Sequence, residues 1–206
     1  MQNVATVGRV ESASFESFAG LSGILSGVAG LLYAIAFVVL KDQLLSGLFL
    51  MLGGIFSTAL LVGVYYRLRE TDAAFSLWGL WLALAGALGA IIHGGYDLST
   101  AINPPSSDVL SNANIPFLVD PRGLMTFGVA SIGTFTLAWL MTRNGFFGKN
   151  LAYLGYLLAV LMIELYLARM IIVDAKSLAI LLPAALAGFI VNPAWNIWLG
   201  LKFWRG

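Results

Sequence analysis

The stretch that decides the fold is residues 43–66, which read QLLSGLFLMLGGIFSTALLVGVYY. It contains no charged side chain, whereas Lys41 and Asp42 precede it and Arg67 follows it. An α-helix needs about 20 predominantly apolar residues to cross the hydrocarbon core of a bilayer, because each residue adds about 1.5 Å. The stretch therefore predicts a transmembrane helix.

Similar apolar stretches recur along the chain. With 60% hydrophobic and 10% charged residues, the sequence is too apolar for a soluble domain, whose exterior must face water. We predict an all-α, polytopic membrane bundle: an N-terminal segment over 1–19, followed by a single domain over 20–206. Its six transmembrane helices are expected at 20–40, 43–66, 75–98, 122–142, 151–173 and 177–201.

The basic residues predict the orientation of these helices. Cytoplasmic loops of membrane proteins are enriched in Lys and Arg, so the richer side is expected to face the cytoplasm. This side also holds both termini, which predicts a multi-pass protein of the plasma (inner) membrane with cytoplasmic N- and C-termini. The richer side has Arg9, Arg67, Arg69, Arg143, Lys149, Lys202 and Arg205, and the other side has Lys41, Arg122 and Lys176.

The long connection at 99–121 then lies outside the cell. It separates a first half at 20–98 from a second half at 122–201. Asn103-Pro104-Pro105 and Asp120-Pro121 are typical of turns and loops. Two interpretations stay open, a lid over an outward-facing cavity and a passive connector between the halves.

The two halves share residues at a nearly constant offset. Gly27-Val28-Ala29 matches Gly128-Val129-Ala130, and Tyr66 and Arg69 match Tyr166 and Arg169. Three helices in each half place the second half in the opposite orientation, which is the topology of a 3+3 inverted repeat. Chance is the competing explanation, because a composition rich in Gly, Ala and Leu generates such matches freely.

Polar side chains inside apolar helices predict a ligand-binding site. Such residues are costly in lipid and usually face the interior of the bundle or a functional cavity. We expected Asp97 to pair with Arg169 and His93 to hydrogen-bond toward Glu164. The predicted ligand-binding residues are His93, Tyr96, Asp97, Glu164, Arg169, Asn192 and Asn196.

Each of these residues also has a purely structural interpretation. Arg169 can anchor its helix at the membrane interface, and Glu164 and Arg169 lie five residues apart, about 140° around an ideal helix. Asp97 lies within a turn of a predicted helix end, where water reaches it, and His93 can be a hydrogen-bonded structural histidine. Pro193 can form either a static kink or a hinge that exposes backbone carbonyl groups.

The composition excludes several kinds of chemistry. The chain has no cysteine and only one histidine, which removes thiolate-ligated metals, iron–sulfur clusters, bis-histidine haem and most zinc sites. No serine lies in a nucleophile-elbow pattern. We therefore predict no metal, no cofactor and no catalytic residue. A net charge of +1 without a basic cluster argues against a nucleic-acid partner.

The run Asn192–Gly200, NPAWNIWLG, is similar to the closing helix of a bacterial family of six-span integral membrane proteins of unknown function. The similarity covers that helix and the number of spans. It implies the six-span architecture and no activity.

Three classes of function remain open on the sequence. The first is a protein that binds or translocates a small or amphipathic ligand, such as a lipid, in an outward-facing polar cavity between the halves. The second is an accessory or structural subunit that packs against other membrane chains or against copies of itself. The third is an intramembrane enzyme or redox partner.

Overall fold

The computed structural model describes residues 3–104, 123–172 and 177–205, with the side chains described from residue 14 onward. Within these residues the chain is helical throughout, apart from short connections. Short π-helical turns, labelled η, occur at the end of the first span, at the start of the fourth and within the sixth. The elements are α1 (Asn3–Ala34), η1 (Ile35–Leu40), α2 (Gln43–Leu68), α3 (Ala73–Ile102), η2 (Leu124–Val129), α5 (Ala130–Arg143), α6 (Lys149–Ile172), α7 (Leu178–Ala185), η3 (Leu186–Val191) and α8 (Asn192–Arg205).

These elements form six helices that are long and apolar enough to cross a membrane, which confirms the predicted all-α six-helix bundle. Most helix ends fall within a few residues of the prediction. The clearest difference is the first helix, which already begins at Asn3 and runs through the predicted N-terminal segment. In addition, α3 continues to Ile102, so it includes the first residues of the predicted outer loop. Residues 105–121 of that loop lie outside the described residues.

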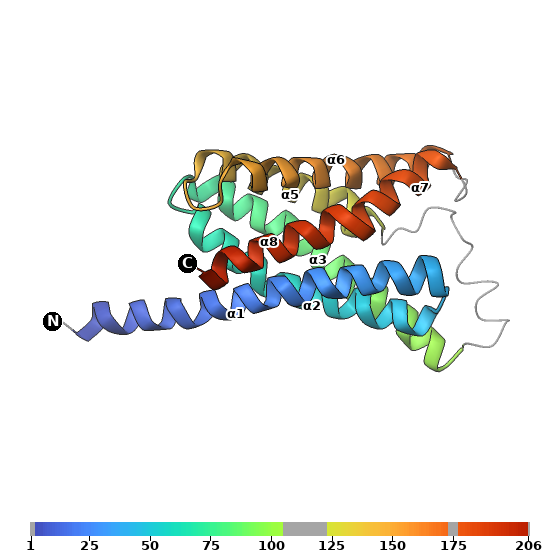
Figure 1. The fold of residues 1–206 in the computed structure, drawn as a ribbon, viewed down its shortest axis with the longest axis horizontal. Helices are drawn as coiled ribbons and strands as arrows, with labels where there is room; N and C mark the ends of the chain where they lie inside the picture. Colours follow the sequence, from blue (N-terminus) through green and yellow to red (C-terminus); the bar gives the residue numbers. More distant parts are fainter. Residues whose placement is uncertain (1–2, 105–122, 173–176, 206) are drawn as a thin grey trace.

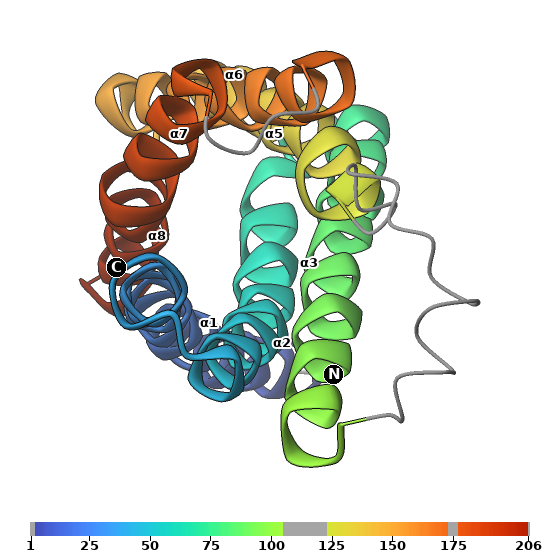
Figure 2. The same ribbon diagram turned by 90° about the vertical axis from the view of Figure 1, so that its right-hand side faces the viewer.

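The six spans form a ring in which each helix packs against its neighbours in the chain. The contacts run from α1 to α2, α2 to α3, α3 to α5, α5 to α6 and α6 to α7, and α8 closes the ring against α1. Figure 2, which looks along the bundle, shows this order. Successive spans alternate in direction, so the N- and C-terminal ends lie at the same end of the bundle (Figure 1).

The predicted inverted repeat can be compared with this ring. If the two halves are equivalent, the interface between α1 and α8 corresponds to the interface between α5 and α3. Both interfaces are present, as a repeat requires. However, any closed ring of six consecutive helices has this correspondence, so it does not distinguish a duplication from chance. The inverted duplication therefore stays a prediction that rests on the residue matches alone.

Glycines bring the helices into close contact. A Cβ atom on Gly200 of α8 would lie 2.5 Å from the carbonyl oxygen of Gly20 in α1. One on Gly94 of α3 would lie 2.5 Å from the backbone nitrogen of Met51 in α2, and one on Gly133 of α5 would lie 2.4 Å from that of Ala83 in α3. Small residues allow this backbone approach, and van der Waals packing then drives helix association where lipid removes the hydrophobic contribution.

Apolar side chains fill the terminus-bearing half of the ring. Leu68, Leu151 and Leu199 are fully buried there, from three different spans. The connection between α5 and α6 adds Phe147, which packs against Phe203 of α8 with ring centroids 6.0 Å apart. This half of the bundle is therefore a packed apolar core.

Candidate functional site

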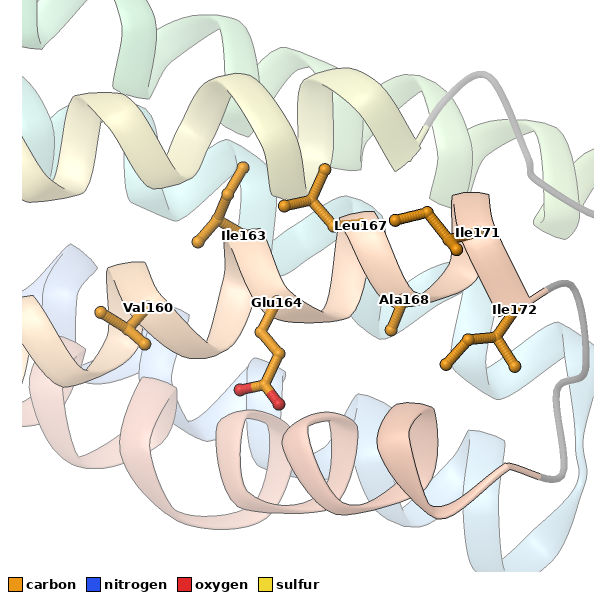
Figure 3. Close-up of a pocket in the computed structure, with 7 residues that line it drawn as sticks. All are labelled: Val160, Ile163, Glu164, Leu167, Ala168, Ile171 and Ile172. Atoms are coloured by element: carbon orange, nitrogen blue, oxygen red, sulfur yellow. The ribbon is translucent and has the colours of Figure 1, made fainter.

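Glu164 lies in an open groove on α6. The groove has a volume of about 480 Å³. Figure 3 shows the carboxylate of Glu164 directed toward the span formed by α7, η3 and α8. The other residues that line the groove are all apolar: Val160, Ile163, Leu167, Ala168, Ile171 and Ile172. The site therefore consists of one acidic side chain surrounded by hydrocarbon.

The groove lies on the outward face of α6. Leu158, Leu161 and Leu165 are buried on the other face of this helix, toward the core of the ring. Glu164 is exposed, and so are the apolar side chains one turn before and after it, Val160 and Leu167. In a bilayer this face meets lipid. Glu164 is therefore not directed into a central cavity of the bundle.

The depth of Glu164 makes its position costly. It lies eight residues before the end of α6 at Ile172, which is about 12 Å along a helix of about 36 Å. A charged side chain near the middle of the bilayer costs several kcal/mol unless it is neutralised or paired. Within the described part of the chain, Glu164 forms no ion pair and no hydrogen bond. An acceptor group that is held in hydrocarbon in this way attracts a cation or a hydrogen-bond donor.

The predicted site residues of α3 lie elsewhere in the ring. His93 and Asp97 are one helical turn apart, with His93 Nε2 3.4 Å from Asp97 Oδ2, and both side chains are largely buried. Tyr96 is exposed on the same helix. Because α3 packs on α2, α5 and η2, whereas α6 packs on α5, η2, α7, η3 and α8, these residues do not meet Glu164.

Arg169 lies on a different side of α6 from Glu164. Its Nη1 atom is 3.9 Å from the position of a Cβ atom on Gly123, just before η2. Neither the expected Asp97–Arg169 ion pair nor the expected hydrogen bond from His93 to Glu164 forms between these described residues, so both predicted pairings are wrong. The physical reason is the separation of about 140° between Glu164 and Arg169, together with the distance between α3 and α6 in the ring.

Asn192 and Asn196 form a local hydrogen-bonded pair on the sixth span. Asn196 Nδ2 donates to Asn192 Oδ1 at 2.7 Å and to the Asn192 carbonyl oxygen at 3.0 Å. The preceding turn, η3, is π-helical, and the Asn192 N–H donates to the Ala187 carbonyl oxygen. This wider turn comes just before Pro193, which cannot donate and whose ring disturbs regular α-helical bonding. The two side-chain amides are thus bonded to each other within their own helix.

The sequence did not predict the contacts of Arg67. Arg67 Nη2 lies 2.7 Å from Glu16 Oε2 of α1, and the guanidinium group lies 4.4 Å from the centre of the Phe146 ring. Asn144 Nδ2 donates to the Arg67 carbonyl oxygen and to Thr71 Oγ1. A side chain of α2 thus joins α1 to the α5–α6 connection. Only the position of Arg67 at a span end was visible in the sequence, because its partners lie 51 and 79 residues away.

The described residues contain no group of three His, Asp or Glu side chains arranged to hold a metal ion. A scan against models of protein families, a comparison with curated proteins and a comparison with solved structures each found no match. The candidate site is therefore interpreted from its own chemistry.

Proposed function

We propose that the protein binds an amphipathic molecule that reaches it from the bilayer, with Glu164 as the polar anchor in the groove on α6. The observation that carries this proposal is the exposed carboxyl group near mid-membrane, surrounded by apolar side chains. The groove is open toward the surrounding bilayer, and its lining is apolar apart from Glu164. Its apolar walls suit the hydrocarbon part of such a molecule.

The proposed site on α6 does not lie where the sequence predicted one, in a cavity between the two halves. The predicted site residues are distributed over α3, α6 and α8, and the groove includes only Glu164 among them. Binding from the bilayer requires neither a central cavity nor translocation. His93 and Asp97 form a second, separate polar pair on α3, to which we assign no ligand.

An accessory subunit is the second candidate, and one observation favours it. The exposed face of α6 carries Leu157, Val160, Glu164, Leu167 and Ile171 at spacings of three and four residues. This is the spacing with which one helix packs along another. A polar group on a neighbouring chain could then satisfy Glu164 in place of a small molecule. No contact among the described residues favours the enzyme interpretation.

Membrane and orientation belong to the same proposal. We place the protein in a plasma membrane with both termini in the cytoplasm, because most of the described basic residues lie at the terminus-bearing end of the ring. These are Arg67, Arg69, Arg143, Lys149, Lys202 and Arg205. The similarity of the closing helix to a bacterial six-span family supports the same membrane but adds no activity.

Native mass spectrometry of the gently purified protein tests the proposed function. The wild type is expected to retain a reproducible small molecule or lipid, and Glu164→Gln is expected to lose it while remaining folded. Glu70→Gln is the matched control, because Glu70 is exposed in the turn after α2, far from the groove. An empty monomer would contradict ligand binding, and a stoichiometric complex with another membrane protein would favour the subunit.

A further inference from the structure

We propose that the groove on α6 selects lipophilic cations, which are molecules that carry a positive charge within a largely hydrocarbon body. This inference rests on the proposed function and names the ligand class of that same site. It follows from the charge complementarity between Glu164 and such a ligand, and from the chemistry of the walls around it.

The first step concerns the wall of the groove. Apart from Glu164, all of its lining residues are apolar, so a ligand head group can form a charged or hydrogen-bonded contact only with the carboxylate. A carboxylate accepts hydrogen bonds and attracts positive charge, but it repels sulfate, phosphate and carboxylate head groups. The groove therefore discriminates by the sign of the ligand charge.

The second step concerns competing charges within the protein. Arg169 is the nearest cationic residue along α6, and its guanidinium group lies beside Gly123 rather than in the groove. The opposing span, formed by α7, η3 and α8, has no basic residue before Lys202, near its cytoplasmic end. Among the described residues, no cation thus neutralises Glu164, and a ligand can supply the missing charge.

The third step concerns desolvation. A small inorganic cation is strongly hydrated, so moving it into hydrocarbon costs far more than one weak carboxylate contact returns. A cation surrounded by hydrocarbon has already lost most of this hydration and partitions readily into the bilayer. In a site of low dielectric constant, its attraction to a carboxylate is much stronger than in water. Lipophilic cations are therefore favoured over metal ions.

The positive group could also belong to a lipid, since ethanolamine and choline head groups carry one. Such lipids place an anionic phosphate beside the amine, which the apolar walls cannot satisfy. Glu164 also lies about 12 Å inside the end of its helix, below the depth of lipid head groups. The site therefore fits a free lipophilic cation better than a zwitterionic lipid.

Equilibrium dialysis with two ions of matched size and shape tests the inference. The full-length protein is placed in phosphatidylcholine nanodiscs and exposed to labelled tetraphenylphosphonium or tetraphenylborate, with empty nanodiscs to correct for partitioning. We expect the wild type to bind the cation at least tenfold more tightly than the anion. We expect Glu164→Gln to lose this preference, while Glu70→Gln keeps it.

A second variant tests separately whether the groove binds ligands at all and whether it selects cations. Ala168→Trp fills the groove but keeps Glu164, so it should abolish binding of the cation without removing the carboxyl group. If both ions bind equally, are lost in Ala168→Trp and persist in Glu164→Gln, the groove binds ligands but the charge selection is wrong. If neither ion binds to the wild type, the proposed function fails together with the inference. If added phosphatidylethanolamine displaces the cation, the natural source of the charge is a lipid, and the choice of a free cation is overturned.

Discussion

At the scale of single residues, Arg67 connects several parts of the terminus-bearing end of the bundle. It forms an ion pair with Glu16, stacks on Phe146 and receives a hydrogen bond from Asn144 at its carbonyl oxygen. Partly exposed ion pairs and cation–π contacts contribute up to about 1 kcal/mol each. The contribution of this residue is therefore the sum of modest contacts across three segments of the chain.

Arg67→Ala is expected to lower the free energy of unfolding by about 1–2 kcal/mol, because it removes the ion pair and the stacking contact together. Glu16→Gln should cost less, about 0.5 kcal/mol, since the stacking remains. Unfolding of the purified protein in mixed dodecyl maltoside and sodium dodecyl sulfate measures both values. A double-mutant cycle without coupling would show that the pair contributes nothing.

Arg69→Ala serves as the control for this experiment. Arg69 is exposed, and its guanidinium group lies 4.6 Å from the centre of the Tyr66 ring. Its loss should change stability by no more than about 0.5 kcal/mol. An equal effect at both arginines would mean that the general charge of this end matters, rather than the specific partners of Arg67.

The difference between these two arginines could not be predicted from the sequence. Both follow the same apolar stretch, and both contribute to the positive end that predicted the orientation. Their roles differ because helix packing brings Glu16 and Phe146 to one of them only. Glu164 is a similar case: its position within an apolar run marked it for function, but the side of α6 that faces lipid depends on which neighbours pack against the other side.

At the scale of elements, the ring closes where α8 meets α1 through glycine. Gly200→Ala is expected to destabilise the protein by about 1–3 kcal/mol, because the added methyl group would overlap the Gly20 carbonyl oxygen and the Ile24 nitrogen. Both obstacles are backbone atoms, so the helices must separate to accommodate the change. Thermal unfolding in dodecyl maltoside measures the loss.

Gly145→Ala is the matched control, since no atom lies within 4 Å of the position that its Cβ would occupy. It should leave the unfolding midpoint nearly unchanged. If Gly200→Ala were equally neutral, the close approach of α1 and α8 would not hold in solution.

A side-chain hydrogen bond also links the sixth span to the fifth. Trp195 is buried in α8, and its Nε1 donates to the Leu151 carbonyl oxygen of α6 at 3.2 Å. Trp195→Phe keeps an aromatic ring but removes this donor, so we expect a loss of about 0.5–1.5 kcal/mol in the same unfolding assay. Trp198→Phe, at an exposed position one turn nearer the end, should have little effect. Equal losses would indicate that ring size, not the hydrogen bond, explains the result.

The elements themselves follow well from the sequence. Uninterrupted apolar stretches give spans such as Gln43–Leu68 to within a few residues of the prediction, because the thickness of the bilayer fixes their length. The π-helical turns were not predicted, since they arise where a span adapts to its neighbours or to proline. The extension of α1 to Asn3 was missed as well, because a helix does not have to stop where its apolar stretch stops.

At the scale of the whole molecule, the ring has two chemically different ends. One end carries both termini and most of the described Lys and Arg side chains, and the other carries the α1–α2 turn and the end of α3. The positive-inside rule predicts that the basic end faces the cytoplasm, which is the orientation proposed above. In this proposed orientation the proposed ligand would approach Glu164 from the outer leaflet, because Glu164 lies nearer the opposite end of α6.

The orientation can be tested with single cysteines, because the natural chain contains none. Asn103→Cys lies just after α3, and Gly145→Cys lies in the connection between α5 and α6, and both positions are exposed. In intact spheroplasts, a membrane-impermeant maleimide should label Asn103→Cys and leave Gly145→Cys unlabelled. After permeabilisation both should react, which controls for access. The reverse labelling pattern would show that the protein has the opposite orientation in the membrane. A ligand that enters from the outer leaflet would then have to cross most of the bilayer to reach Glu164.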